Sequence, residues 1–155
     1  MIMMKISTIL LHCGLKRLDK IMKIFQPIKI NSLKLKNRIG MSSMCQYSSD
    51  DNGYVNDWHI DHWKTRAIGG VGLIMSEATA IRSDGKLTEN DLCLFNKKQA
   101  KKFQSAINQI HGLDTKFGIQ LVHCGRKSWG KKKGKGKFKL ISSSAIAFDD
   151  GWVTP

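Results

Sequence analysis

The stretch V-G-L-I-M-S-E-A, residues 71–78, decides the fold class. It is almost continuously apolar, which is typical of a strand covered on both faces of a parallel sheet. Two comparable runs flank it along the chain: R-I-G-M-S-S-M at residues 38–44 and K-F-G-I-Q-L-V-H at residues 116–123. All three runs end in small, polar or chemically capable side chains. We therefore predict three core strands that open into functional loops.

A helical pattern separates the first two of these strands. After a polar loop, Asp57 is expected to cap a helix whose apolar face carries Ile60, Trp63 and Ala67 at helical spacing. The glycine pair at residues 69–70 is expected to end this helix.

A second helical pattern lies between the second and third strands. Asn96 and Gln99 have the spacing of a capping box. The predicted apolar face of this helix consists of Ala100, Phe103, Ile107 and Ile110. The resulting order, β-α-β-α-β, indicates parallel units with right-handed crossovers. Upstream, alternating segments on either side of Asn31-Ser32 predict a β-hairpin.

Two α/β architectures fit this order. A doubly wound sheet is expected to place a glycine-rich turn after the first strand, but residues 41–45 read M-S-S-M-C. A (β/α)8 TIM barrel places reactive side chains at the carboxyl ends of successive strands, where this chain has Cys45, Glu77 and Gln120. We favour the barrel. A complete barrel takes about 250 residues, so the three to four units here are expected to be its N-terminal portion.

Composition limits the classes of function. The chain has 155 residues and 26 Lys plus Arg against 12 Asp plus Glu, which gives a net charge of +14. One domain is expected, and an alternative function is that of a small basic nucleic-acid-binding protein. Six lysines lie between Lys131 and Lys139, where a solvated loop is the simplest interpretation; only Phe138 interleaves with them for base stacking.

The cysteines, the histidines and the apolar runs limit the cellular compartment and the kinds of site that we expect. The four cysteines form no C-x-x-C pair, which argues against a zinc module, and free thiols fit a cytoplasmic protein. His59 and His62 have a spacing that could hold a metal, but no further ligand is paired with them, so no metal is expected. No apolar run reaches the roughly 18 residues of a membrane span.

Three segments together resemble the Old Yellow Enzyme family, in its branch of bacterial NADPH dehydrogenases and xenobiotic reductases. They are M-S-S-M-C-Q-Y-S-S at 41–49, the run from His59 to Ala80, and G-I-Q-L-V-H-C-G-R-K at 118–127. The resemblance covers residues 23–155, so residues 1–22 are expected to be an extension outside the fold. It implies an FMN-dependent oxidoreductase that transfers hydride from NADPH or NADH to an activated alkene such as an enone, and a homo-oligomeric full-length enzyme.

The resemblance also implies roles for individual residues. It assigns flavin contacts to Ser42, Ser43, Met44 and Cys45, a small side chain beside the ring to Ala78, an amide at its polar edge to Gln120, and a substrate contact to Tyr47. These types suit a flavin, which needs apolar walls and a few fixed donors and acceptors. Without the resemblance, a lone cysteine at a strand end such as Cys45 is more often an inert small apolar side chain, and the amide of Gln120 is likewise more often without a functional role.

Two features depart from the family pattern. Ser43 and Ser143 replace prolines, which is expected to loosen the loops around the flavin site. The family's substrate-binding histidine pair, proton-donating tyrosine and phosphate cradle would lie beyond Pro155. We therefore expect this chain alone to bind FMN weakly and to be inactive.

Overall fold

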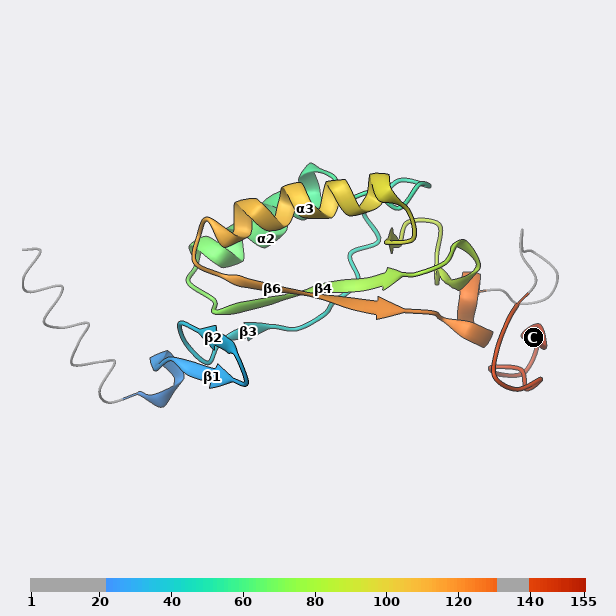
Figure 1. Cartoon of the computed structure of the whole chain (residues 1–155). Helices are drawn as coiled ribbons and strands as arrows, with labels where there is room; N and C mark the ends of the chain where they lie inside the picture. Colours follow the sequence, from blue (N-terminus) through green and yellow to red (C-terminus); the bar gives the residue numbers. More distant parts are fainter. Residues whose placement is uncertain (1–21, 131–139) are drawn as a thin grey trace, which may run out of the picture.

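In the computed structural model, which describes residues 22–130 and 140–155, two helices cover one face of a small parallel sheet (Figure 1). The elements in chain order are η1 (Lys23–Phe25), β1 (Ile28–Ile30), β2 (Leu33–Leu35), β3 (Gly40–Met41), α2 (Asp57–Ile68), β4 (Leu73–Ala80), η2 (Ser83–Gly85), β5 (Leu92–Cys93), α3 (Lys97–His111), β6 (Lys116–Val122) and η3 (Gly125–Gly130). The predicted β-α-β-α-β order is confirmed by β3, α2, β4, α3 and β6.

Strand β4 is the centre of the sheet. Its amino-terminal half pairs with β3, its carboxyl end pairs with β5 through Thr79 and Leu92, and β6 runs along its other edge, all in parallel. The short strand β5 was not predicted, because two residues carry no periodic signal. Its position is fixed by a hydrogen bond from the Cys93 N–H to the Gly53 carbonyl oxygen (2.9 Å).

The first and third core strands differ from their predicted form. Only Gly40–Met41 pairs with β4, since further along the chain β5 occupies that edge. Strand β6 is half-exposed rather than buried, and the side chain of Leu121 is 60% exposed. The helices cover one face of β6, and no strand in residues 22–130 and 140–155 pairs with its outer edge.

The hydrophobic core lies between the helices and the sheet. The Trp63 ring stacks on Phe103 with centroids 6.2 Å apart and meets the edge of Phe117 at 4.8 Å. Both predicted helix faces are confirmed except at Ala100, which is exposed. Gln99 is buried in its place, and its side-chain amide donates to the Asn52 carbonyl oxygen (2.8 Å).

The helix ends follow capping chemistry. The cap of α2 is Asn56, not Asp57 as predicted: its side-chain oxygen accepts from the His59 N–H (3.4 Å), whereas Asp57 is the first helical residue. An aspartate there still favours the helix, because the amino end carries partial positive charge. After α2, Gly70 takes φ +93°, a conformation that suits glycine.

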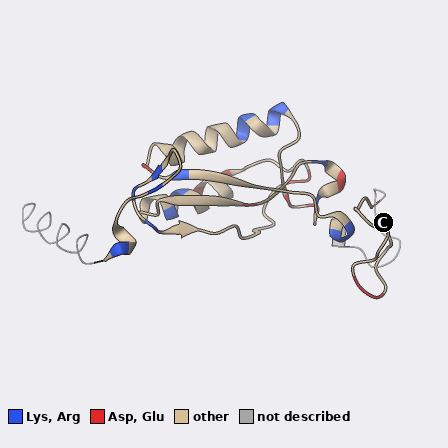
Figure 2. Cartoon of the chain, turned by 60° about the horizontal axis from the view of Figure 1, so that its bottom comes forward, with Lys and Arg blue, Asp and Glu red and all other residues tan. Residues whose placement is uncertain are grey.

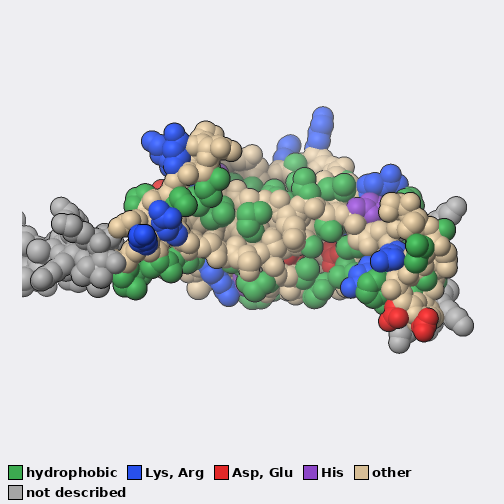
Figure 3. Space-filling view, turned by 90° about the horizontal axis from the view of Figure 1, so that it is seen from below, with side chains coloured by type: hydrophobic (Ala, Val, Ile, Leu, Met, Phe, Trp, Pro, Cys, Tyr) green, Lys and Arg blue, Asp and Glu red, His purple; other side chains and the backbone are tan. Residues whose placement is uncertain are grey.

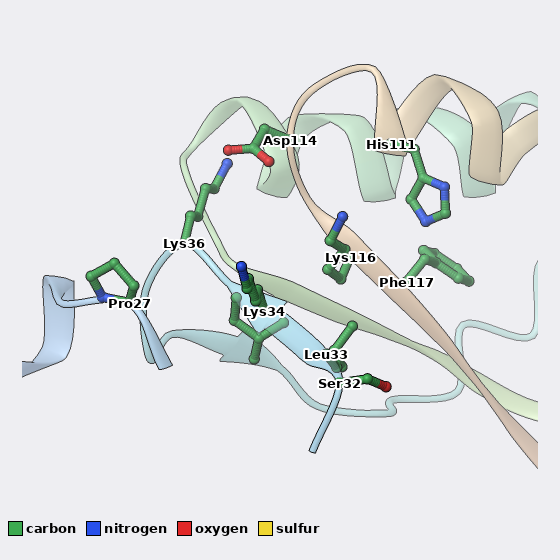
Figure 4. A pocket seen from close by; sticks show the side chains of 10 residues that line it. Pro27, Ser32, Leu33, Lys34, Lys36, His111, Asp114, Lys116 and Phe117 are labelled. Atoms are coloured by element: carbon green, nitrogen blue, oxygen red, sulfur yellow. The ribbon is translucent and has the colours of Figure 1, made fainter. Parts of the chain in front are cut away.

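A hairpin lies at the amino-terminal end of the sheet (Figure 1). Strands β1 and β2 pair antiparallel across the predicted turn, where Asn31 has φ +51°. A cavity of about 660 Å³ separates the hairpin from the turn between α3 and β6 (Figure 4). Across this gap the Lys36 ammonium donates to the Leu113 carbonyl oxygen (3.2 Å) and to Thr115 Oγ1 (3.3 Å), which joins the hairpin to the sheet.

The basic residues are dispersed. Figure 2 shows Lys and Arg at both ends of the sheet and along α3, rather than in a single patch. The lysine-rich stretch Lys131–Lys139 and the predicted N-terminal extension through residue 21 lie outside the described residues. Among the described helices, none combines the length and the apolarity needed to cross a membrane.

Candidate functional site

A β-bulge in β4 determines which side chains face away from the helices. Met75 pairs with Gly118 and Ala78 pairs with Gln120, so β4 uses three steps where β6 uses two. If residues 74–78 alternated regularly between the two faces, Ala78 would share the face of Ile74, which packs in the core beneath the helices. The bulge therefore places Ala78 beside Gln120 on the open face of the sheet.

Side-chain hydroxyls hold the bulge in place. Ser76 Oγ accepts from the Gln120 N–H (3.2 Å) and donates to the Glu77 carbonyl oxygen (3.0 Å). Thr79 Oγ1 donates to the same carbonyl oxygen (2.9 Å). Ser76 and Thr79 are fully buried. Their hydroxyl groups therefore bond backbone groups that lose their partners where the bulge interrupts the hydrogen bonds between β4 and β6.

The segment after β3 runs beside the bulge. The Gln46 N–H donates to Glu77 Oε1 (3.3 Å), which fixes the stretch Ser42–Tyr47 next to the residue that precedes Ala78. Within this stretch Met44 is 50% exposed, and Ser42, Cys45 and Tyr47 are also exposed. Ser43 is half-buried. Seen from the side opposite the helices, apolar side chains are spread over this face (Figure 3).

Tyr47 and two cysteines lie together near the carboxyl end of the sheet. Tyr47 has φ +52°, a strained backbone conformation that is often found at functional sites. Partial desolvation, together with the neighbouring Cys45 thiol within hydrogen-bonding reach, raises the pKa of Tyr47 although much of its side chain is exposed. Burial, with Asp91 and Cys45 nearby, raises the pKa of the Cys124 thiol to about 11, so this thiol stays protonated at neutral pH.

The amide of Gln120 is available for a ligand. The residue is exposed, and its side chain has no hydrogen-bond partner within the described part of the chain. An amide offers both a donor and an acceptor. Gln120 thus presents both kinds of group beside Ala78 on the open face.

A buried acid–imidazole pair lies behind the site, and sequence reasoning missed it. Glu77 Oε2 is 3.9 Å from His59 Nε2, and neither atom has a hydrogen-bond partner among the described residues. Burial raises the pKa of Glu77 to about 7 and lowers the pKa of His59 to about 4. Both groups are therefore largely uncharged near pH 6. The pattern S-E-A alone gives no signal that the bulge turns this carboxyl group toward α2.

The two histidines of α2, His59 and His62, are not arranged as a pair of metal ligands. His59 Nδ1 lies 2.6 Å from the Asn56 side-chain oxygen, so the cap itself occupies one ring nitrogen. Both ring nitrogens of His62 are buried without a partner in the described residues, and its ring contacts Trp58 edge-on. Over residues 22–130 and 140–155, no three His, Cys, Asp or Glu side chains are grouped to hold a metal.

Relatives with the same sequence pattern are known. Residues 23–148 match the NADH:flavin oxidoreductase / NADH oxidase family. The chain is 41% identical over 134 residues to an NADPH dehydrogenase of Clostridium acetobutylicum and, over the same length, 41% identical to one of Bacillus subtilis. Each match covers 86% of this chain but 38% of the relative, so the chain spans under two-fifths of the length of these enzymes.

Solved structures share the fold. Morphinone reductase superposes with a TM-score of 0.73 at 22% identity, over 85% of this chain and 38% of that one. The old yellow enzyme from Trypanosoma cruzi superposes with a TM-score of 0.68 at 20% identity, over 83% of this chain and 36% of that one. These proteins are TIM barrels, and the predicted fold class, the N-terminal portion of such a barrel, is confirmed. On the sequence match and the shared fold together, the chain belongs to the NADH:flavin oxidoreductase / NADH oxidase family, the family of the Old Yellow Enzymes.

Proposed function

We propose that this chain forms the flavin-facing N-terminal part of an FMN-dependent oxidoreductase that uses NADPH or NADH to reduce activated alkenes such as enones. The observation that carries the proposal is the pairing of Ala78 with Gln120 on the open face, beside the segment that contains Cys45. When bound, FMN supplies the two-electron transfer from the nicotinamide coenzyme to the alkene. Family membership supports this chemistry.

The residues on this face fit an isoalloxazine ring. Ala78 is small enough to allow close approach of a flat ring, and the exposed Met44 offers an apolar wall. The unpartnered amide of Gln120 can donate to and accept from the polar edge of the ring. Ser42, Ser43 and Cys45 complete the proposed contacts from the segment fixed by Gln46 and Glu77.

Tyr47 is proposed to contact the substrate. Its raised pKa keeps the phenol protonated at neutral pH, so the hydroxyl can donate a hydrogen bond to an acceptor such as an enone carbonyl oxygen. The neighbouring Cys45 thiol is placed to influence this hydroxyl. Such a bond orients the alkene without requiring proton transfer from Tyr47.

We further propose that the isolated chain binds FMN weakly and does not turn over. The open face of the sheet offers contacts to one side of the ring. No glycine-rich phosphate cradle is formed by the described residues, and backbone N–H groups of such a cradle hold phosphate strongly. Affinity is therefore expected to be micromolar or weaker.

Quenching of FMN fluorescence by the purified chain tests the proposal. Q120L keeps the size of the side chain but removes both polar groups, so it is expected to weaken FMN binding about tenfold. Q109L, at an exposed position on α3, is the matched control and is expected to leave the affinity unchanged. Equal affinities for Q120L and Q109L, or no quenching by the parent chain, would refute the flavin site. A purified chain that is yellow and oxidises NADPH would refute the weak-binding proposal.

A further inference from the structure

A cleft of about 480 Å³ opens beyond the carboxyl ends of β4 and β6, outside the residues proposed to contact the flavin. Three segments line it: Arg82 after β4, residues 123–126 after β6, and residues 141–143 near the carboxyl end of the chain. Two of its side chains are arginines, and none of the described residues that line it is acidic. A cleft with this composition is suited to an anion.

Arg82 is held in a fixed orientation. Its Nε donates to Asp84 Oδ1 (2.9 Å) and its Nη2 donates to Asp84 Oδ2 (2.8 Å). This pair uses one edge of the guanidinium group and leaves the Nη1 donors without a partner in the described residues. The side chain is 61% exposed, so these donors are accessible. A fixed guanidinium fork matches the geometry of phosphate oxygens.

The same aspartate approaches His123. His123 Nδ1 accepts from the Gly125 N–H (3.1 Å), so in the neutral ring the proton is on Nε2, which lies 3.6 Å from Asp84 Oδ1. Gly85 packs directly against the ring: a Cβ at this position would be 2.8 Å from His123 Cδ2. The loops after β4 and β6 are therefore tied together, and the cleft between them has a defined shape.

The third segment that lines the cleft, residues 141–143, is held near η3 through Arg126. Arg126 Nη1 donates to the Ala147 carbonyl oxygen (3.5 Å), and its guanidinium carbon is 6.0 Å from the centre of the Phe148 ring. These contacts join the C-terminal segment to η3, and Ser142 and Ser143 of that segment line the cleft. Two guanidinium groups and two hydroxyl groups together suit a tetrahedral, doubly charged phosphate.

We propose that this cleft binds the 2′-phosphate of a phosphorylated nicotinamide coenzyme and so selects NADPH over NADH. The inference rests on the proposed function, because the two coenzymes differ only in this phosphomonoester. The cleft lies at the same edge of the sheet as Ala78 and Gln120, where the nicotinamide would react.

Binding of adenosine 2′-phosphate to the 155-residue chain, measured by calorimetry, tests the inference without FMN. R82Q and R126Q are each expected to weaken binding about tenfold or more, because each removes charge-assisted hydrogen bonds. R38Q, at an exposed arginine at the other end of the sheet, is the matched control and is expected to change the affinity less than about twofold. The amide NMR signal of Gly125 should shift on addition of adenosine 2′-phosphate and not of adenosine.

Several outcomes would overturn the inference. Equal weakening by R38Q would show non-specific attraction to a basic protein. Binding of inorganic phosphate or adenosine 5′-phosphate as tight as that of adenosine 2′-phosphate would show a general anion site rather than coenzyme selection. Quenching of FMN without any binding of adenosine 2′-phosphate would reject the inference and leave the proposed function standing. Binding of adenosine 2′-phosphate without any quenching of FMN would reject the flavin site alone.

Discussion

The buried carboxyl group of Glu77 is expected to make the folded chain less stable as the pH rises. Burial raises its pKa from the usual 4.5 to about 7, so between these values the folded state holds a proton that the unfolded state has lost. The free energy of unfolding therefore falls as pH increases from 4.5 and levels off above about 7. The difference between the two pKa values corresponds to about 3 kcal/mol.

His59 contributes with the opposite sign. Burial lowers its pKa from 6.5 to about 4, so its contribution to stability is present above pH 6.5 and is lost as the pH falls through 4. Between pH 4.5 and 6.5 the two contributions partly cancel in the parent chain. A variant at Glu77 is needed to separate them.

E77Q provides this separation. The amide keeps an oxygen for the Gln46 N–H and offers a donor to His59 Nε2, but it does not titrate. Relative to the parent chain, E77Q is expected to gain about 3 kcal/mol of stability between pH 4.5 and about pH 8. Urea unfolding followed by tryptophan fluorescence at a series of pH values measures this difference.

E89Q, at an exposed carboxylate, is the control and should follow the parent chain throughout. If the stability of E77Q and that of the parent chain change in parallel with pH, Glu77 has an ordinary pKa and the described burial is wrong.

Four further substitutions test the packing and the caps by the same unfolding measurement. W63A removes the central core ring and is expected to cost about 3–5 kcal/mol; a loss below about 1 kcal/mol would contradict its burial. G72A would place a Cβ 2.8 Å from Asn37 Oδ1 and 2.9 Å from its carbonyl oxygen, so a loss of about 1–3 kcal/mol is expected, and an unchanged midpoint would show that this contact is absent. N56A is expected to cost about 1 kcal/mol and D57A a few tenths, and the reverse order would restore Asp57 as the cap.

Periodic apolar patterns correctly predicted the elements of the fold that bury one face of a helix or strand. The two helices, the hairpin and the order of the three main strands all follow from burial of regularly spaced side chains, as at Trp63 and Phe103. The pattern failed at Ala100, since burial of the neighbouring Gln99 depends on a hydrogen bond to Asn52, a residue 47 positions away. No local periodicity encodes such a bond.

The sequence predicted which residues lie at the ends of the strands, but not the contacts behind them. Strand ends identified Cys45 and Gln120 because parallel strands present their carboxyl ends at one edge of a sheet. The roles given to them remain proposals. The acid–imidazole pair of Glu77 and His59 was missed, because it depends on an irregularity in β4 that leaves no mark in composition or spacing.

That irregularity also makes the length of β4 a constraint on the site. Deleting one residue at position 76 or 77 would restore regular alternation in β4. Ala78 would stay opposite Gln120 on the open face, because Met75 and Ala78 would then be two positions apart, as Gly118 and Gln120 are. The strand would instead lose either the Ser76 hydroxyl that bonds the Gln120 N–H or the Glu77 carboxyl group that bonds the Gln46 N–H. A single-codon deletion here would thus keep the open face but remove a side chain that joins β4 to its neighbours, and evolution of this strand is expected to proceed by substitution rather than by changes in length.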